Sequence, residues 1–268
     1  MPDSENTIGL IPMAGQATRL KGLPLSKELF PFGLSIDDIS GTKRFNVISD
    51  VLINRMRKAG VQRFHLIIRE GKWDIPSYFK DGEVQEVSLA YHITRENWGV
   101  PFSLDIAYPF IRDHNVMFGF PDIFVRPEHI FYDLAEHLRH NSHTDMVLGT
   151  FPVEDGSQWD VVRTNDQGKL LGIELKDPEI KGEAVAWVIA AWRPSFTNFL
   201  HTYVKGKKAY CSLNQEELYL GKVIHDFSNE GFRVDTVHFE HGECVDIGTP
   251  ENLQRALKMS TGFNSEPK

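Results

Sequence analysis

A loop that follows the first apolar run of the chain combines small residues with two separated cations. The stretch MAGQATRLKGLPLSKEL begins at Met13 and carries Arg19 and, eight residues later, Lys27. Small residues let a backbone approach an anion, backbone N–H groups donate to it, and two cations add full positive charge. The stretch therefore predicts a phosphate-binding loop, although an ordinary connection with two surface cations explains the spacing equally well.

The elements around this loop alternate between strands and helices. Apolar runs of strand length occur at Thr7–Pro12, Phe64–Ile68, Val87–Ile93, Asn115–Phe120 and Met146–Pro152. Apolar residues recur at helical spacing in Phe45–Ala59 and Pro127–Asn141. This alternation predicts an α/β fold with a Rossmann-like, mostly parallel sheet and helices on both faces. Such sheets bind ligands at the carboxyl ends of their strands, which is where the loop lies.

The second half of the chain has a different pattern. Asp160–Thr164 and Leu170–Glu174 flank the turn NDQG and predict a hairpin, and Ala184–Trp192 predicts a long apolar strand. Helices are expected over Leu213–Glu230 and Pro250–Met259, and the polar tail 260–268 is expected to fray. We therefore expect a single domain, residues 1–268, that includes a small β-rich lobe for the substrate.

Composition argues against several classes of protein. The chain has 268 residues and a net charge of -8, whereas nucleic-acid binders normally carry basic surfaces. Two cysteines without zinc-ligand spacing indicate a reducing setting, and no apolar run approaches the length of a membrane span. The polar start MPDSENT lacks the features of a signal peptide, so we expect a cytoplasmic protein without a membrane partner.

The first loop resembles the signature of the sugar-1-phosphate nucleotidylyltransferases, also called nucleoside-diphosphate-sugar pyrophosphorylases. Their pattern is A-G-G-x-G-T-R-L followed by P-K-x-L, and here it stands as Ala14-Gly15-Gln16-Ala17-Thr18-Arg19-Leu20 and Ser26-Lys27-Glu28-Leu29. Further segments match in order: GVPFSL from Gly99, MFGFPDIF around Asp122, the hairpin WDVVRTNDQGKLLGIELKDP, and DIGTP from Asp246. The resemblance spans about residues 8–257.

This resemblance implies a reaction and its substrates. A nucleoside monophosphate would pass from a nucleoside triphosphate, with UTP or dTTP expected, to a sugar 1-phosphate, and pyrophosphate would leave. The nucleotide-binding part would span about residues 7–125 and the sugar-binding part about residues 126–257. The expected partners are therefore these two substrates, with no nucleic acid, and a homo-oligomer is a further expectation because family members often form dimers or tetramers.

The resemblance also implies site residues and a metal cofactor. Mg²⁺ would be held by Asp122 and Asp246, and its preference for carboxylate and phosphate oxygens suits the reaction. Arg19 and Lys27 would be catalytic, on the triphosphate and near the charge that develops at the α-phosphate. The nucleotide would contact Ala14, Gly15, Gln16, Ala17, Thr18 and Gly99. The sugar phosphate would contact Glu174 and Lys176.

Structural explanations compete with several of these roles. Asp122 follows Pro121 at a strand end, where aspartate commonly caps a turn. Thr249 explains the start of the following helix as its N-cap, which leaves Asp246 without a structural role and favours a functional one. Glu174 and Lys176 alternate on a strand edge and could form a solvated face.

Departures from the family pattern leave other functions open. They are Ala17 in place of glycine, Ser26 in place of proline, Trp159-Asp160 in place of Tyr-Gly, and Leu175 between Glu174 and Lys176. A cytidylyltransferase acting on phosphocholine or another small phosphate is one alternative, and an acidic or tightly apolar acceptor pocket would favour it. A non-catalytic sensor of nucleotides or sugar phosphates is another. Retention of both cations and both aspartates favours an enzyme.

Overall fold

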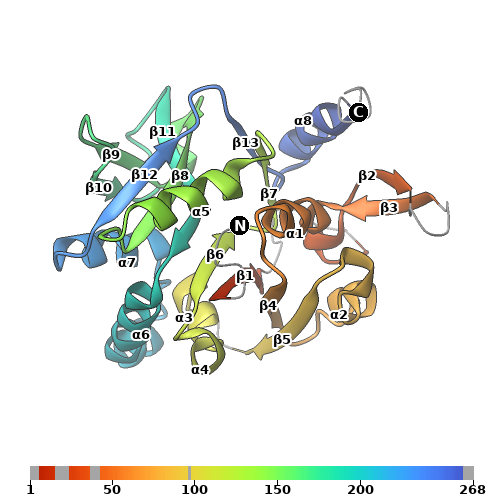
Figure 1. Cartoon of the computed structure of the whole chain (residues 1–268), viewed down its shortest axis with the longest axis horizontal. Coiled ribbons are helices and arrows are strands. Elements are labelled where there is room, and N and C mark those ends of the chain that lie inside the picture. Colours follow the sequence, from red (N-terminus) through yellow and green to blue (C-terminus); the bar gives the residue numbers. More distant parts are fainter. Residues whose placement is uncertain (1–5, 16–23, 37–42, 96–97, 262–268) are drawn as a thin grey trace.

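The computed structural model describes residues 6–15, 24–36, 43–95 and 98–261. At 34–36, 43–44 and 259–261 it describes the backbone alone. Its centre is a nine-stranded sheet with the order β10-β9-β11-β6-β1-β4-β5, to which β8 adds beside β11 and β12 beside β8 (Figure 1). Four neighbouring strands within it run parallel to one another, and their bounds are β1 Thr7–Met13, β4 Arg63–Arg69, β5 Ser88–Thr94 and β6 Asn115–Gly119. This half confirms the predicted Rossmann-like arrangement.

The other half of the sheet reverses direction at β11 (Ala184–Trp192), which pairs antiparallel with β6 and with β8 (Met146–Val153). The hairpin of β9 (Val161–Thr164) and β10 (Leu170–Glu174) continues it, and β12 (Val234–His238) lies parallel to β8. The sheet is therefore mixed, and the expected β-rich lobe is an extension of it, at one end of the molecule (Figure 1).

Two further strand pairs stand outside the main sheet. β7 (Ile123–Arg126) pairs antiparallel with β13 (Glu243–Asp246), and β2 (Pro31–Ile36) pairs antiparallel with β3 (Lys43–Val47). The β2–β3 pair and α8 (Pro250–Thr261) lie at the end of the molecule opposite the β9–β10 hairpin (Figure 1). Short 3-10 turns occur at Lys27–Leu29, Glu83–Gln85 and Gly156–Gln158.

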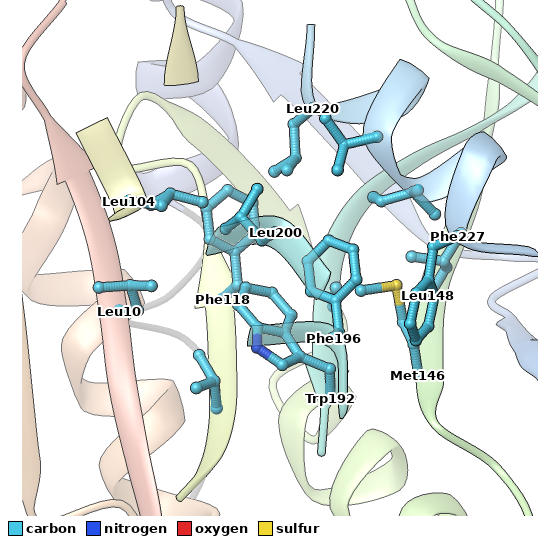
Figure 2. Packing of buried hydrophobic residues seen from close by; sticks show 14 of the residues in the cluster. Leu10, Leu104, Phe118, Met146, Leu148, Trp192, Phe196, Leu200, Leu220 and Phe227 are labelled. Atoms are coloured by element: carbon cyan, nitrogen blue, oxygen red, sulfur yellow. The ribbon is translucent and has the colours of Figure 1, made fainter. Parts of the chain in front are cut away.

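Helices cover both faces of the sheet because its central strands are apolar on both sides. In β1, Ile8 and Leu10 face one cluster of buried side chains, and Ile11 and Met13 face the other. The first cluster joins residues of α3 (Val100–Asp105), α4 (Tyr108–Ile111), α6 (Pro194–Asn214) and α7 (Leu220–Asn229). Figure 2 shows side chains of this cluster, among them Leu10 and Phe118 from the sheet and Phe196 and Phe227 from the helices.

The second cluster lies beneath α1 (Ile48–Lys58), α2 (Asp74–Phe79) and α5 (Ile130–His140). Both α1 and α5 begin three residues after their predicted starts, α1 because residues 45–47 belong to β3. Apart from such shifts at their ends, the predicted strands and these two helices are confirmed.

The helix predicted over Leu213–Glu230 is wrong. The chain forms α6, which ends at Asn214, and α7, which begins at Leu220. Gln215 takes a left-handed conformation with φ of 52°, and a helix of L-residues does not continue through such a position. The non-helical residues 216–219 between the two helices reach the candidate site described next.

Candidate active site

Asp122 and Asp246 are brought together by the β7–β13 pair. Asp122 immediately precedes β7, and Asp246 ends β13 directly opposite Ile123. The backbone N–H of Ile247 donates to the carbonyl oxygen of Asp122 at 2.9 Å, which extends the pairing by one step. The two predicted metal ligands therefore lie side by side although they are far apart in the sequence.

Each aspartate also has a local environment that orients it. The Oδ1 atom of Asp246 accepts from the backbone N–H of Gly248 at 2.7 Å. The Thr249 hydroxyl accepts from the backbone N–H of Asn252 at 3.3 Å, so Thr249 caps α8 as predicted and Asp246 does not. The carboxylate of Asp122 forms an ion pair with the ammonium of Lys27. Lys27 therefore reaches the predicted metal-binding carboxylates.

Lys27 is fixed by its own neighbours. The carboxylate of Asp74 accepts from the backbone N–H of Ser26 at 2.6 Å and from its hydroxyl at 2.9 Å, which anchors the residue before Lys27. Burial disfavours the charged ammonium, but the carboxylates of Asp122, Glu28 and Asp246 outweigh this effect, and the pKa of Lys27 is raised. Lys27 is therefore held in its cationic form.

A second lysine supports this arrangement. Lys72 follows β4, and its Nζ lies 2.8 Å from both carboxylate oxygens of Glu28 and 3.0 Å from the carbonyl oxygen of Met13. Glu28 is only 1% exposed, and its burial raises its pKa although Lys72 and Lys27 oppose the shift. The ion pair ties the loop carrying Lys27 to the carboxyl ends of β1 and β4.

The end of the first loop and Lys27 face a common cavity, called here the loop cavity. It has a volume of about 170 Å³, and the predicted residues that line it are Ala14, Gly15, Lys27, Gly99 and Asp122. A side-chain carbon placed on Gly15 would lie 3.5 Å from the Lys27 Nζ, so the ammonium lies against the loop backbone. Donors for an anion thus converge where the sequence predicts phosphate binding.

A second cavity, called here the hairpin cavity, adjoins the loop cavity and has a volume of about 230 Å³. The two share Val100, Phe120, Asp122 and Glu217 as lining residues. The hairpin cavity adds Asp246 and Lys176 among the predicted residues. An outer cleft of about 850 Å³ continues from it past Trp159, Lys176 and Asp246. Ala14, Gly15 and Gly99 of the predicted nucleotide residues, both predicted metal ligands and Lys176 thus line cavities that adjoin one another.

Comparison with solved structures identifies the architecture around this space. A putative glucose-1-phosphate thymidylyltransferase from Bacillus anthracis, solved with sucrose, superposes with a TM-score of 0.79 at 18% identity, over 97% of this chain and 98% of that one. A UDP-glucose pyrophosphorylase solved with UDP-glucose gives 0.73 at 15% identity, over 97% and 99%. HddC from Yersinia pseudotuberculosis gives 0.64 at 16% identity, over 94% and 98%. This chain has the sugar nucleotidylyltransferase fold.

The resemblance found in the sequence is thus confirmed at the level of this fold. The sequence itself matches no protein-family model and no curated protein. Among the described helices, none combines the length and the apolar composition that crossing a lipid bilayer requires.

Within the nucleotidylyltransferase fold, some predicted site residues are not brought to the cavities. Glu174 on β10 forms an ion pair with Arg163 of β9 and is not among the residues lining the loop or hairpin cavity. Lys176, two residues on, turns into the hairpin cavity with a φ of 21°. The inserted Leu175 thus separates two residues that the family pattern has adjacent. The predictions for Gln16, Ala17, Thr18 and Arg19 fall outside the described residues.

Several residues of the site were missed in the sequence. Lys72 comes three residues after the end of β4, and a lysine just past the carboxyl end of the strand beside β1 was a usable signal. Glu217 lies between two helices that were predicted as one, which hid it. Asp160 also lines the hairpin cavity. Asp160 was noticed only as a departure from the family pattern.

Proposed function

We propose that this protein transfers a nucleoside monophosphate from a nucleoside triphosphate to a sugar 1-phosphate. The observation that carries the proposal is the convergence of Lys27, Asp122 and Asp246 where the loop and hairpin cavities meet. A cation and two carboxylates beside a phosphate-binding loop suit a reaction between two polyanions. In this proposal the triphosphate binds in the loop cavity and the acceptor binds in the hairpin cavity.

The reaction needs positioning and charge neutralisation more than proton transfer. An oxygen of the acceptor phosphate forms a bond to the α-phosphorus, and the bond from that phosphorus to its bridging oxygen breaks. The bond electrons leave with pyrophosphate. Because the attacking oxygen is already ionised, the step requires no general base. Coulomb repulsion between the reactants is the main obstacle, and fixed cations lower it.

Lys27 and Lys176 divide this task in the proposal. Lys27 lies beside the loop at Gly15, and neighbouring carboxylates raise its pKa, so in this proposal its ammonium neutralises charge at the α-phosphate and the leaving group. Lys176 lines the hairpin cavity and binds the acceptor phosphate. Arg19, on the expectation from its motif, would bind the triphosphate.

Asp122 and Asp246 would hold Mg²⁺, and their donor set fits that ion. Mg²⁺ commonly binds through one or two carboxylates and completes its octahedral shell with substrate phosphates and water. Within the described part of the chain, no three His, Cys, Asp or Glu side chains form a metal-binding group, and the two carboxylates are what the protein would supply. When bound, the ion would neutralise phosphate charge and orient the triphosphate. Asp122 also forms an ion pair with Lys27.

For the donor, we propose UTP or dTTP. Support comes from the names of two structures with this fold, one a thymidylyltransferase and one a UDP-glucose pyrophosphorylase. The activity test that follows includes each nucleoside triphosphate.

Pyrophosphate release tests the proposal. The protein is incubated with Mg²⁺, each nucleoside triphosphate in turn, and a panel of sugar 1-phosphates together with phosphocholine. Release that requires both a triphosphate and one sugar 1-phosphate, and that is lost in Lys27→Ala, supports the proposal. Release with phosphocholine alone would keep the nucleotidyl transfer and replace the sugar 1-phosphate as its acceptor. Triphosphate binding by thermal shift without release from any pair would contradict it and favour a sensor.

A further inference from the structure

The hairpin cavity carries more negative charge than the proposed metal requires. Its lining includes the carboxylates of Asp122, Asp160, Glu217 and Asp246, whereas Lys176 is the one cation among the described lining residues. In the proposed function Asp122 and Asp246 would bind Mg²⁺. Asp160 and Glu217 remain, in a cavity that must also admit the phosphate of an acceptor. An anionic acceptor without any positive group would meet both of them unfavourably.

Asp160 is the more constrained of these two carboxylates. Its Oδ1 atom is buried and has no hydrogen-bond partner among the described residues. The start of α7 packs against its other oxygen so closely that a side chain on Gly221 would overlap it. Burial raises the pKa of Asp160, while Lys176 and Trp187 act in the opposite direction. A buried carboxylate with an unsatisfied oxygen is costly unless a ligand completes its interactions.

The walls beside Asp160 are aromatic. Trp187 is 3% exposed, and its indole Nε1 is buried without a hydrogen-bond partner of good geometry among the described residues. Trp159, Phe120 and Tyr219 line the same cavity. Aromatic faces attract ammonium groups, and the attraction strengthens where water is excluded. Carboxylates and aromatic rings together form a surface suited to an organic cation.

We propose that the acceptor is a phosphate monoester that carries a positively charged amino or quaternary ammonium group, and that this group binds between Asp160, Glu217 and the aromatic walls of the hairpin cavity. The proposal rests on the proposed function and specifies its acceptor. The acceptor phosphate would face Lys176 and the proposed metal site, and the cationic group would face the carboxylates of Asp160 and Glu217. An amino sugar 1-phosphate has this chemistry and keeps the proposed sugar 1-phosphate acceptor. An amino-alcohol phosphate has it too and would replace the sugar 1-phosphate in the same transfer reaction.

A neutral sugar phosphate would satisfy the cavity less well. A hydroxyl group can donate one hydrogen bond to Asp160, but it brings no positive charge to Asp160 and Glu217, and Lys176, the cation that interacts with Asp160, is shared with the acceptor phosphate in this proposal. A cation compensates the two carboxylates directly, and hydrogen bonds between charged groups are stronger than neutral ones. Neutral hydroxyl recognition would also be served by an asparagine at position 160, without the desolvation cost of a buried charge.

The test compares acceptors that differ in charge and little else. Glucosamine 1-phosphate is paired with glucose 1-phosphate, and phosphocholine with its neutral carbon analogue 3,3-dimethylbutyl phosphate. We expect kcat/KM to favour the cationic member of at least one pair by roughly tenfold to a hundredfold. The pair that responds distinguishes an amino sugar from an amino alcohol. Equal or better use of the neutral members would overturn the inference and leave the proposed function standing.

Substitutions locate the effect. In Asp160→Asn the preference should fall to near unity through a higher KM for the cationic acceptor, with kcat changed little. Glu217→Gln, at an exposed position, should reduce the preference in the same direction and is the second variant if Asp160→Asn folds poorly. Asp166→Asn, in the exposed turn of the same hairpin, is the matched control and should keep the full preference. A preference that survives both cavity substitutions would overturn the inference.

Calorimetric binding covers the case in which no acceptor reacts. Absence of pyrophosphate release with every pair argues against the proposed function. Titration of phosphocholine and glucosamine 1-phosphate into the protein then decides the inference by itself. Binding that Asp160→Asn weakens at least about tenfold supports it, and binding that is absent, or equal for the neutral partners, overturns it.

Discussion

Lys72 and Glu28 form an ion pair in which the lysine Nζ lies 2.8 Å from each carboxylate oxygen, with side chains 14% and 1% exposed. The same ammonium donates to the carbonyl oxygen of Met13 at the end of β1. The pair therefore joins three segments around the loop cavity. Because water barely reaches the pair, each charged group relies on the other to offset the cost of its burial.

Loss of Lys72 should destabilise the fold strongly. In Lys72→Met the carboxylate of Glu28 stays buried without its partner, and removal of one member of a buried pair costs about 3–5 kcal/mol. Urea unfolding followed by circular dichroism measures the change. The double variant Glu28→Gln/Lys72→Met should recover part of the loss because no buried charge remains. Lys58→Met, which removes an exposed pair with Glu128, should cost less than about 1 kcal/mol.

Lys27→Ala should abolish most of the turnover while the fold stays intact. Lys27 is the cation held against the loop backbone and Asp122, so its loss removes charge stabilisation in the transition state. Loss of one such group typically lowers kcat by about a hundredfold to a thousandfold. Pyrophosphate release measures kcat, and Lys58→Ala is the control. Near-normal turnover in Lys27→Ala would show that Lys27 has another role.

Asp246→Asn should act through the metal site and leave the local turn in place. The amide oxygen of asparagine can still accept from the Gly248 backbone N–H, so the melting temperature should change little. A neutral ligand binds Mg²⁺ less tightly than a carboxylate. We expect turnover at fixed Mg²⁺ to fall about a hundredfold or more and higher Mg²⁺ to restore part of it. A variant with unaltered Mg²⁺ dependence would refute the ligand assignment.

Gly99→Ala should destabilise the protein more than an alanine at a comparable open position. Gly99 has a φ of 105°, and a Cβ there would overlap the carbonyl oxygen of Leu218. The two segments cannot easily move apart, since the Leu218 N–H donates to the carbonyl oxygen of Trp98, the residue before Gly99, at 2.9 Å. Backbone strain of about 1–3 kcal/mol then adds to a steric clash. Gly231→Ala, with φ of 92° and open space around it, should show the strain alone.

Stability should decline in acid through His65. Burial, followed by the nearby His92, Arg63 and His114, lowers the pKa of His65 to about 4. The unfolded chain binds this proton near pH 6.5, so between about pH 6.5 and 4 the unfolded state takes up more protons than the folded one. The free energy of unfolding should therefore fall as the pH is lowered through this range. In His65→Gln, chemical unfolding at several pH values should give a flatter dependence, and an unchanged slope would exclude His65 as the source.

Local patterns in the sequence were sufficient to predict the parallel half of the sheet. β1, β4 and β6 are short, continuous apolar runs that are buried on both faces, and such runs are recognisable without tertiary information. The reversal at β11 was not predictable in this way. Strand direction depends on which neighbour a strand joins, and β11 is an equally apolar run that joins β6 and β8 antiparallel.

The candidate site shows the same division. The motifs carrying Lys27, Asp122 and Asp246 were visible, and the structure brings all three together. Lys72 and Glu28 were not recognised because a buried ion pair between distant residues leaves no periodic signal. Glu174 was placed in the site by analogy, and the residue inserted after it accounts for its different direction.

The β7–β13 pair also determines when the candidate site is completed during synthesis of the chain. β13 comes after every strand of the main sheet along the chain. During synthesis the parallel strands can therefore pair, and the loop cavity can take shape, before Asp246 has been made. A ribosome-bound chain that stops short of residue 243 would hold Lys27 and Asp122 and lack their partner. In such a chain the proposed metal site lacks one of its two carboxylates, so on the proposed function activity begins only after Asp246 has been made.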